Sequence, residues 1–225
     1  MSEYKELIID VSEFQENIDW EQIKQYTPIK GVILRCGYGN NDPSQDDETF
    51  TYNAKACERL NIPYGVYLYS YAQNADMIDS ECQHILRLVR GRIPTLPIYI
   101  DFEHEKDECR AYAKEGSYLA KSIIESAGYK FGVYANLYWW ENYLPKNIEC
   151  SKWVAQYHIE CEYKQPYDIW QFTSQGKVTG IEGTVDLNYL YNPNLLSNTT
   201  ETEGISISWG ELETKIGRKI KSISK

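Results

Sequence analysis

Four acidic residues lie at or near the ends of short runs of β-branched and aromatic residues, and their carboxyl groups are the first candidates for chemistry. The four residues are Asp10, Asp101, Glu103 and Asp186. If Asp101 and Glu103 lie on one strand, they face the same side with Cα atoms about 6.6 Å apart, at roughly 3.3 Å per residue. Like charges this close cannot all ionise freely, so at least one pKa should rise and leave a carboxylic acid near neutral pH. An acid beside a carboxylate is what glycoside hydrolysis requires.

A divalent metal ion is the other occupant that four carboxyl groups can hold, and it would make the chain a metal-dependent carbohydrate hydrolase. Against this, no lysine or arginine cluster suits a phosphate partner, and no Ser-His-Asp, Cys-His or phosphate-loop pattern is present. The six cysteines and three histidines show no zinc spacing. We therefore expect no metal ion and no cofactor, and we interpret the cysteines as reduced and mostly buried.

The elements that must position these carboxyl groups alternate along the chain. Strands are predicted at 7–11, 31–36, 64–70, 97–103 and 131–135. Helices are predicted from Trp20 after the N-cap Asp19, and at 50–60, 76–89 and 110–127. Three closely spaced strands follow at 153–157, 168–172 and 185–189.

This order predicts parallel βα units that close with an irregular, helix-poor end, and an open doubly wound sheet is the competing arrangement. Eight strands suit a barrel. Ligands of such folds bind at the carboxyl ends of the strands. If the barrel closes, its first and last strands become neighbours and Asp10 comes close to Asp186. All four carboxyl groups would then converge on one mouth.

Length and composition bound the class of protein. A chain of 225 residues with 42% hydrophobic positions fits one globular domain, and its net charge of −10 argues against binding nucleic acid through phosphate contacts. No run reaches the roughly 18 apolar residues of a transmembrane segment. Because Met1–Asp10 lacks the order of a secretory signal, we expect synthesis in the cytoplasm, and any work outside the cell would need another exit route.

The composition changes near the C-terminus, which divides the chain into a barrel at 1–191, a linker at 192–203 and a tail at 204–225. The tail holds five basic residues against two acidic ones. Such a short basic segment could contact an anionic wall polymer or a membrane surface, or it could be a solubilising appendage or a packed helix.

Six segments carry a resemblance to a known family, and they occur in that family's order and spacing from about residue 7 to residue 191. They are Asp10-Val11-Ser12-Glu13-Phe14-Gln15, Ile18-Asp19-Trp20, Ile100-Asp101-Phe102-Glu103, Trp153-Val154-Ala155-Gln156-Tyr157, Trp170-Gln171-Phe172-Thr173-Ser174 and Val185-Asp186-Leu187-Asn188. The chain resembles glycoside hydrolase family 25, the lysozymes (N-acetylmuramidases) of phage endolysins and bacterial autolysins.

The resemblance implies an α/β fold, an irregular, flattened (β/α) TIM-like barrel with a helix-poor C-terminal half. It implies cleavage of the β-1,4 bond between N-acetylmuramic acid and N-acetylglucosamine in bacterial peptidoglycan. Together with the missing signal, it implies action on the cell wall after release by a holin-type pore or by lysis. By motif position, Glu103 resembles the general acid and Asp101 the carboxylate that assists the reacting sugar. Asp10 and Asp186 resemble the flanking pair. The short spacing of Asp101 and Glu103 favours retention, with assistance from the substrate's own acetamido group.

Six further side chains are candidates for binding the glycan along the groove: Tyr134, Tyr67, Tyr69, Trp139, Gln156 and Trp170. The alternative from another class is a cell-wall glycan-binding module that keeps the groove without catalysis. A pure binding module has no use for a strained acidic cluster, so the presence of all four carboxyl groups favours the enzyme.

Overall fold

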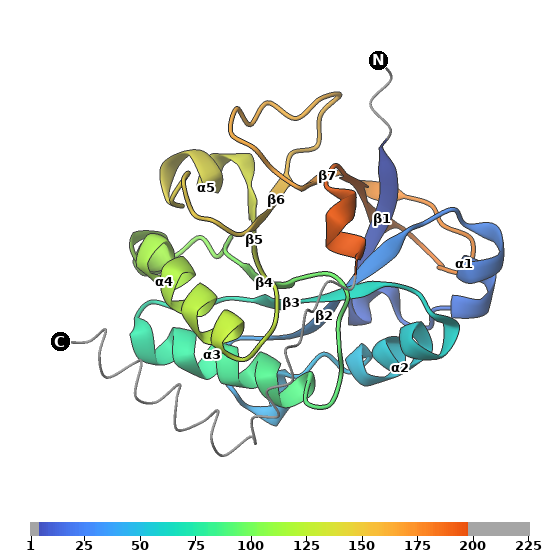
Figure 1. Ribbon diagram of the computed structural model, residues 1–225, viewed down its shortest axis with the longest axis horizontal. Coiled ribbons are helices and arrows are strands. Elements are labelled where there is room, and N and C mark those ends of the chain that lie inside the picture. The colour runs from blue at the N-terminus through green and yellow to red at the C-terminus, as the bar shows by residue number, and fades with distance from the viewer. Residues whose placement is uncertain (1–4, 198–225) are drawn as a thin grey trace.

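The computed structural model describes residues 5–197, whose strands form one closed eight-stranded barrel (Figure 1). The strands are β1 (Glu6–Val11), β2 (Gly31–Tyr38), β3 (Tyr64–Tyr69), β4 (Ile98–Asp101), β5 (Phe131–Asn136), β6 (Ser151–Ala155), β7 (Ile169–Gly176) and β8 (Val185–Leu190). The helices are α1 (Trp20–Tyr26), α2 (Phe50–Leu60), α3 (Ala75–Leu88), α4 (Asp107–Ser126) and α5 (Leu137–Asn142), with 3-10 turns η1 (Glu13–Gln15), η2 (Pro43–Gln45) and η3 (Pro193–Leu196). The predicted barrel is confirmed, and the open doubly wound sheet is excluded.

Strand direction explains how the last strand contributes to the mouth of the barrel. Strands β1 to β7 pair in parallel, whereas β8 is antiparallel to both β7 and β1. Residues 177–184 between β7 and β8 are too few for the crossover of a dozen or more residues that parallel pairing needs. The start of β8 therefore lies beside the carboxyl ends of the other strands, and Asp186 pairs directly with Asp10.

Side-chain alternation divides the interior into two cores. Ile9 on β1 and Ile100 on β4 belong to the core between the strands and the helices. Their strand neighbours Ile8 and Tyr99 face the other way and fill the inside of the barrel with residues of the other strands. Because the period is two, Asp10 follows Ile8 and Asp101 follows Tyr99 on the inner face, one step nearer the mouth.

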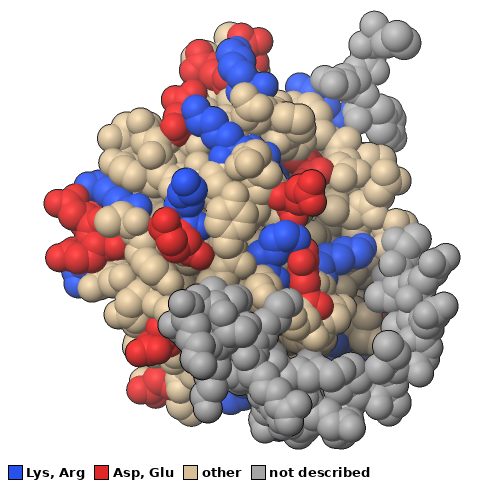
Figure 2. All heavy atoms as spheres, turned by 60° about the vertical axis from the view of Figure 1, so that its left-hand side comes forward, with Lys and Arg blue, Asp and Glu red and all other residues tan. Residues whose placement is uncertain are grey.

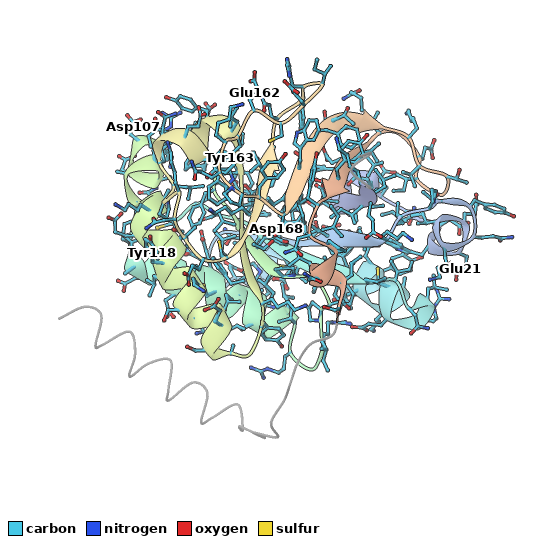
Figure 3. All side chains as sticks on the ribbon, turned by 45° about the horizontal axis from the view of Figure 1, so that its top comes forward. Glu21, Asp107, Tyr118, Glu162, Tyr163 and Asp168 are labelled. Carbon is cyan, nitrogen blue, oxygen red and sulfur yellow. The ribbon has the colours of Figure 1, made fainter. Side chains whose placement is uncertain are left out.

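The helices cover the barrel unevenly. In Figure 1, α2, α3 and α4 lie along one side, whereas loops rather than long helices surround β6 and β7. This arrangement confirms the predicted helix-poor C-terminal half. On the loop between β6 and β7, Glu162 points outward while the Tyr163 ring turns inward onto Trp140, with ring centroids 5.7 Å apart (Figure 3).

The predicted element boundaries hold to within a few residues, with one correction that concerns the site. Strand β4 ends at Asp101, so Glu103 is not a strand residue as predicted but lies in the loop that leads to α4. Helix α4 begins at Asp107, three residues before the predicted start at Arg110. The N-cap predicted for α1 is confirmed, because the Asp19 carboxylate accepts a hydrogen bond from the backbone N–H of Gln22 at 2.9 Å.

The first residues of the predicted linker pack against the barrel. Lys130 donates hydrogen bonds to the carbonyl oxygens of Leu195 at 3.3 Å and Ser197 at 2.9 Å, and Leu195 and Leu196 contact the inner core. The barrel domain therefore extends at least to Ser197 rather than ending at residue 191. The rest of the predicted linker and the predicted tail at 204–225 lie outside the described residues, so that division stays a prediction.

The surface of the described chain carries both signs of charge. On the face shown in Figure 2, lysine and arginine side chains are interspersed with aspartate and glutamate rather than gathered into one patch. Among residues 5–197, no helix has the length and apolar character needed to span a bilayer.

Candidate active site

A cavity of about 300 Å³ opens at the mouth of the barrel, and all four predicted carboxyl groups line it. Its walls are formed by Asp10, Ser12, Phe14, Gln15, Arg35, Tyr67, Tyr69, Asp101, Glu103, Tyr134, Trp153, Tyr157, Gln171 and Asp186. The predicted convergence of Asp10, Asp101, Glu103 and Asp186 on one mouth is therefore confirmed as geometry. Their chemical roles stay predictions.

The four carboxyl groups reach the cavity from different elements and differ in exposure. Asp10 and Asp101 are the inward-facing residues at the ends of β1 and β4 and are 5% and 3% exposed. Asp186 enters from the start of β8, and Glu103 from the loop after β4, and both are half-buried. The site therefore joins two deeply buried carboxyl groups to two that solvent or a ligand can reach.

The pair formed by Asp10 and Asp186 holds protons more tightly than free aspartate does. Burial, followed by the negative charge of Asp186, raises the pKa of Asp10 to about 8, although hydrogen bonds from Asn188 and Gln171 oppose this rise. Burial raises the pKa of Asp186 to about 6, and a hydrogen bond from Tyr157 opposes it. At neutral pH this pair is therefore expected to retain a proton.

The pKa values of the second pair, Asp101 and Glu103, are also raised. Burial raises the pKa of Asp101 well above its usual range, the charges of Glu103 and Asp10 add to the rise, and the Arg35 guanidinium opposes it. Burial and the charge of Asp186 also raise the pKa of Glu103. These directions agree with the prediction of a carboxylic acid near neutral pH, but burial rather than crowding is the largest cause.

One oxygen of the cluster has no partner. Among residues 5–197, no group donates a hydrogen bond to Oδ1 of Asp101, although this atom is buried. A buried polar atom without a partner is costly, and in native proteins it commonly marks a place that a ligand or water fills. Asp101 lines the cavity, but its Oδ1 is almost inaccessible to solvent.

Three of the six predicted binding residues line the cavity, namely Tyr67, Tyr69 and Tyr134. All three face it from the ends of β3 and β5. The Tyr134 hydroxyl donates a hydrogen bond to Oε1 of Gln171 at 2.9 Å. Their contact with the cavity agrees with a binding role, which stays a prediction.

The other three predicted binding residues, Trp139, Gln156 and Trp170, are not among the described residues that line this cavity, so their placement there is corrected. Trp139 lies in α5 and belongs to the core between strands and helices. Trp170 is buried on the outer side of β7, where its indole N–H donates to the Gln156 carbonyl oxygen at 2.8 Å. The Gln156 side chain bonds both the backbone N–H and the carboxylate of Glu162.

Several residues that line the cavity were not predicted from the sequence, and one of them, Arg35, contacts both charged and aromatic neighbours. Its guanidinium donates to Oδ2 of Asp47 at 2.8 Å and to Oε1 of Glu13 at 2.6 Å, and it lies over the Phe14 ring with 4.8 Å to the centroid. The available signal was a charged residue inside the apolar run of β2, two positions after the inward-facing Ile33. Phe14 is 76% exposed at the rim and offers an aromatic surface there.

Metal binding was the alternative use of the cluster. Within the described part of the chain, no three His, Cys, Asp or Glu side chains are arranged to hold a metal ion. What the arrangement can do is general acid–base chemistry on a ligand seated among the four carboxyl groups.

Comparison with known proteins places this geometry in a family. The model of the family described as glycosyl hydrolases family 25 matches residues 9–181. The chain is 25% identical over 190 residues to the uncharacterized protein YegX of Escherichia coli O157:H7, an alignment that covers 80% of this chain and 67% of YegX.

Two solved structures share the fold. The modular autolysin LytC from Streptococcus pneumoniae has a TM-score of 0.72 and 29% sequence identity, covering 85% of this chain and 48% of LytC. The chain thus spans about half the length of that autolysin. The catalytic domain of endolysin ply40 from bacteriophage P40 of Listeria monocytogenes has a TM-score of 0.70 and 22% identity, covering 87% of this chain and 97% of that domain.

Proposed function

The chain belongs to glycosyl hydrolase family 25 and is a glycoside hydrolase, and from this premise we propose that it hydrolyses bacterial peptidoglycan. The bond proposed is the β-1,4 linkage between N-acetylmuramic acid and N-acetylglucosamine, which makes the protein a lysozyme of the muramidase type. The names of the autolysin LytC and the endolysin ply40 support a role in cell-wall lysis.

One observation carries the proposal. Four carboxyl groups, all with raised pKa values, line a single cavity of about 300 Å³ at the mouth of the barrel. Glycoside hydrolysis needs a carboxylic acid that protonates the leaving oxygen and a second group that supports the oxocarbenium-like centre. A cluster in which burial keeps protons on carboxyl groups at neutral pH supplies the acid.

Glu103 is the general acid in this proposal. It is half-buried, so a ligand can reach it, and its raised pKa keeps it protonated to higher pH than a free glutamate. Its position in the loop after β4 places its side chain in the cavity lining beside Asp101.

Asp101 is the partner that orients the substrate's 2-acetamido group. Its side chain lines the cavity together with Glu103, where a carboxyl oxygen can accept a hydrogen bond from the acetamido N–H. The acetamido oxygen then attacks the anomeric carbon as the glycosidic bond breaks and Glu103 passes its proton to the leaving oxygen. Water next adds to the anomeric carbon, returns a proton to Glu103 and reopens the acetamido ring, so the product retains its configuration.

The test is digestion of purified peptidoglycan by the native protein, by Glu103→Gln and by Glu105→Gln, followed by mass spectrometry of borohydride-reduced fragments. Glu105 is the matched control, because it is exposed and lies only two residues further along the same loop. We expect fragments that end in reduced muramic acid, a loss of about 10²-fold or more in rate for Glu103→Gln, and an unchanged rate for Glu105→Gln.

Other outcomes would contradict parts of the proposal. Fragments that end in reduced glucosamine would mean that the protein is a hydrolase but cleaves a different glycosidic bond. A rate for Glu103→Gln equal to that of the native protein would remove Glu103 as the acid. No release from several wall types, with binding to those walls intact, would replace the enzyme by a glycan-binding module.

A further inference from the structure

Asp10 is anchored through one of its two oxygens. Oδ2 accepts a hydrogen bond from Nδ2 of Asn188 at 2.8 Å and a second from Nε2 of Gln171 at 3.1 Å. All three side chains are buried, with Asn188 fully enclosed. Two N–H donors on Oδ2 leave no room there for a proton, because a protonated oxygen would present a third hydrogen to the same place.

The orientation of the Asn188 amide is fixed by a group that can only donate. The indole N–H of Trp153 donates to Oδ1 of Asn188 at 2.7 Å. The other end of the amide, Nδ2, faces two acceptors, namely Asp10 and the Ile8 carbonyl oxygen at 3.5 Å. Rotating the amide by half a turn would place oxygen against oxygen and N–H against N–H, so only the observed orientation is stable.

The Gln171 amide also directs its nitrogen toward Asp10, but its orientation is fixed less strongly than that of Asn188. Its Oε1 accepts from the hydroxyl groups of Tyr134 at 2.9 Å and Tyr157 at 3.1 Å. A tyrosine hydroxyl can either donate or accept, whereas an indole N–H cannot accept. Asn188 is therefore the amide whose direction does not depend on the protonation state of its neighbours.

We propose that Trp153 and Asn188 are positioning residues that reserve Oδ2 of Asp10 as a permanent acceptor, so that Oδ1 is the only atom of Asp10 that takes or gives a proton in the cavity. The inference rests on the proposed function for its catalytic meaning, but the anchoring itself involves no substrate. A proton held at one defined oxygen is a precise hydrogen-bond donor toward a ligand or toward Asp186, which pairs with Asp10 across β1 and β8.

Charged and titratable groups from several strands surround Asp10. The groups are Asp186 from β8, Asp101 and Glu103 from β4 and its loop, Arg35 from β2, Tyr67 from β3, Tyr134 from β5 and Tyr157 after β6. Asp186 and Glu103 favour the neutral form of Asp10, and the amides of Asn188 and Gln171 favour its charged form. Loss of an amide donor should therefore raise the pKa of Asp10.

The experiment measures the titration of Asp10 directly, by carbon-13 NMR of protein labelled at the aspartate carboxyl carbons, with the signal assigned through Asp10→Asn. Trp153→Phe removes the indole donor and keeps an aromatic ring. Trp140→Phe is the control for loss of a buried indole donor, because Trp140 is equally buried and its indole N–H donates to the backbone oxygen of Trp153 at 3.2 Å, not to Asn188 or Asp10. Asn188→Asp is a second, isosteric variant that keeps the acceptor for Trp153 and removes the donor to Asp10.

We expect the titration midpoint of Asp10 to rise by about half a pH unit to one unit in Trp153→Phe, since a hydrogen bond to a charged group is worth roughly one to two pH units. It should rise by more in Asn188→Asp, because there the lost amide donor and the added negative charge act in the same direction. Trp140→Phe should leave the midpoint unchanged. In peptidoglycan digestion, the pH profile of kcat/KM should move by the same amount in Trp153→Phe, with kcat changed more than KM.

An unchanged midpoint in Trp153→Phe and in Asn188→Asp, with both proteins folded, would overturn the inference. So would an equal shift in Trp140→Phe, which would mean that any lost indole donor loosens the barrel. If the shifts occur but the native protein releases no fragments from peptidoglycan, the proposed function fails while the anchoring of Asp10 stands.

Discussion

A buried carboxyl group outside the cavity gives the sharpest test of the electrostatic reasoning. Glu81 on α3 is fully buried, and it accepts hydrogen bonds from the Ser70 hydroxyl at 2.6 Å and the Tyr71 backbone N–H at 2.8 Å. Burial raises its pKa from 4.5 to about 7, against the effect of these two bonds. The folded protein therefore binds this proton more tightly than the unfolded chain, and the free energy of unfolding falls as the pH rises from about 4.5 to 7.

The size of the effect follows from the separation of the two titrations. Each pH unit is worth about 1.4 kcal/mol, so the ionised Glu81 side chain costs about 3 kcal/mol at pH 8. Glutamine has the same shape and does not titrate. Its oxygen can accept from Tyr71 while its amide donates to Ser70, so Glu81→Gln keeps both contacts. We expect the variant to lie within about 1 kcal/mol of the native protein at pH 5 and to be more stable by about 3 kcal/mol at pH 8.

Urea unfolding at pH 5 and pH 8 measures the difference, and thermal unfolding should show a gain of about 6–12 °C at pH 8, at roughly 2–4 °C per kcal/mol for a domain of this size. Glu115→Gln on the exposed face of α4 is the control for loss of a negative charge. If Glu81→Gln differs from the native protein by the same amount at both pH values, Glu81 does not titrate in this window and the reasoning is refuted.

Two further predictions concern packing and binding. Gly132→Ala would place a Cβ atom 2.2 Å from Cε1 of the buried Tyr99 ring, so we expect a loss of about 1–3 kcal/mol or more in urea unfolding. Tyr99→Leu should reduce that loss, and equal losses in both backgrounds would contradict the steric explanation. Phe14→Ala removes the exposed aromatic surface beside the cavity, so KM for soluble glycan fragments should rise about three- to tenfold with kcat unchanged. Tyr26→Ala, an exposed aromatic residue outside the cavity lining, should change neither, and a fall in kcat alone for Phe14→Ala would contradict a binding role.

The barrel itself could be predicted because each strand is a short β-branched or aromatic run followed by a change of period. The direction of β8 was not predicted, because alternation with period two reads the same in both directions along a strand. A signal was present in the length of the β7–β8 connection, residues 177–184, which allows a hairpin and not a crossover. Direction mattered for the site, since it places Asp186 at the mouth from the start of its strand.

The candidate site could be predicted as far as its carboxyl groups, because the acidic residues follow apolar runs and the carboxyl ends of barrel strands meet at one mouth. Trp170 was misplaced, although the same alternation that puts Gln171 inside the barrel puts its neighbour outside. The roles of Gln171 and Asn188 could not be predicted, since an amide is informative only when its partners are known. Here the partners come from β1, β5 and β6, and sequence spacing alone does not bring them together.

The layer beneath the carboxyl groups explains how one barrel both raises their pKa values and orients them. Tyr67, Tyr134 and Trp153 fill the barrel below the mouth, with the Trp153 ring in edge contact with Tyr134 at 4.5 Å and Tyr67 at 6.0 Å. These rings exclude water, which disfavours ionised carboxyl groups above them. A purely aliphatic layer would exclude water equally well, but it could not donate hydrogen bonds to the amides that hold Asp10. Aromatic residues with one polar atom satisfy both demands, so replacing Trp153 by an aliphatic residue should keep the raised pKa values and lose the defined position of the proton.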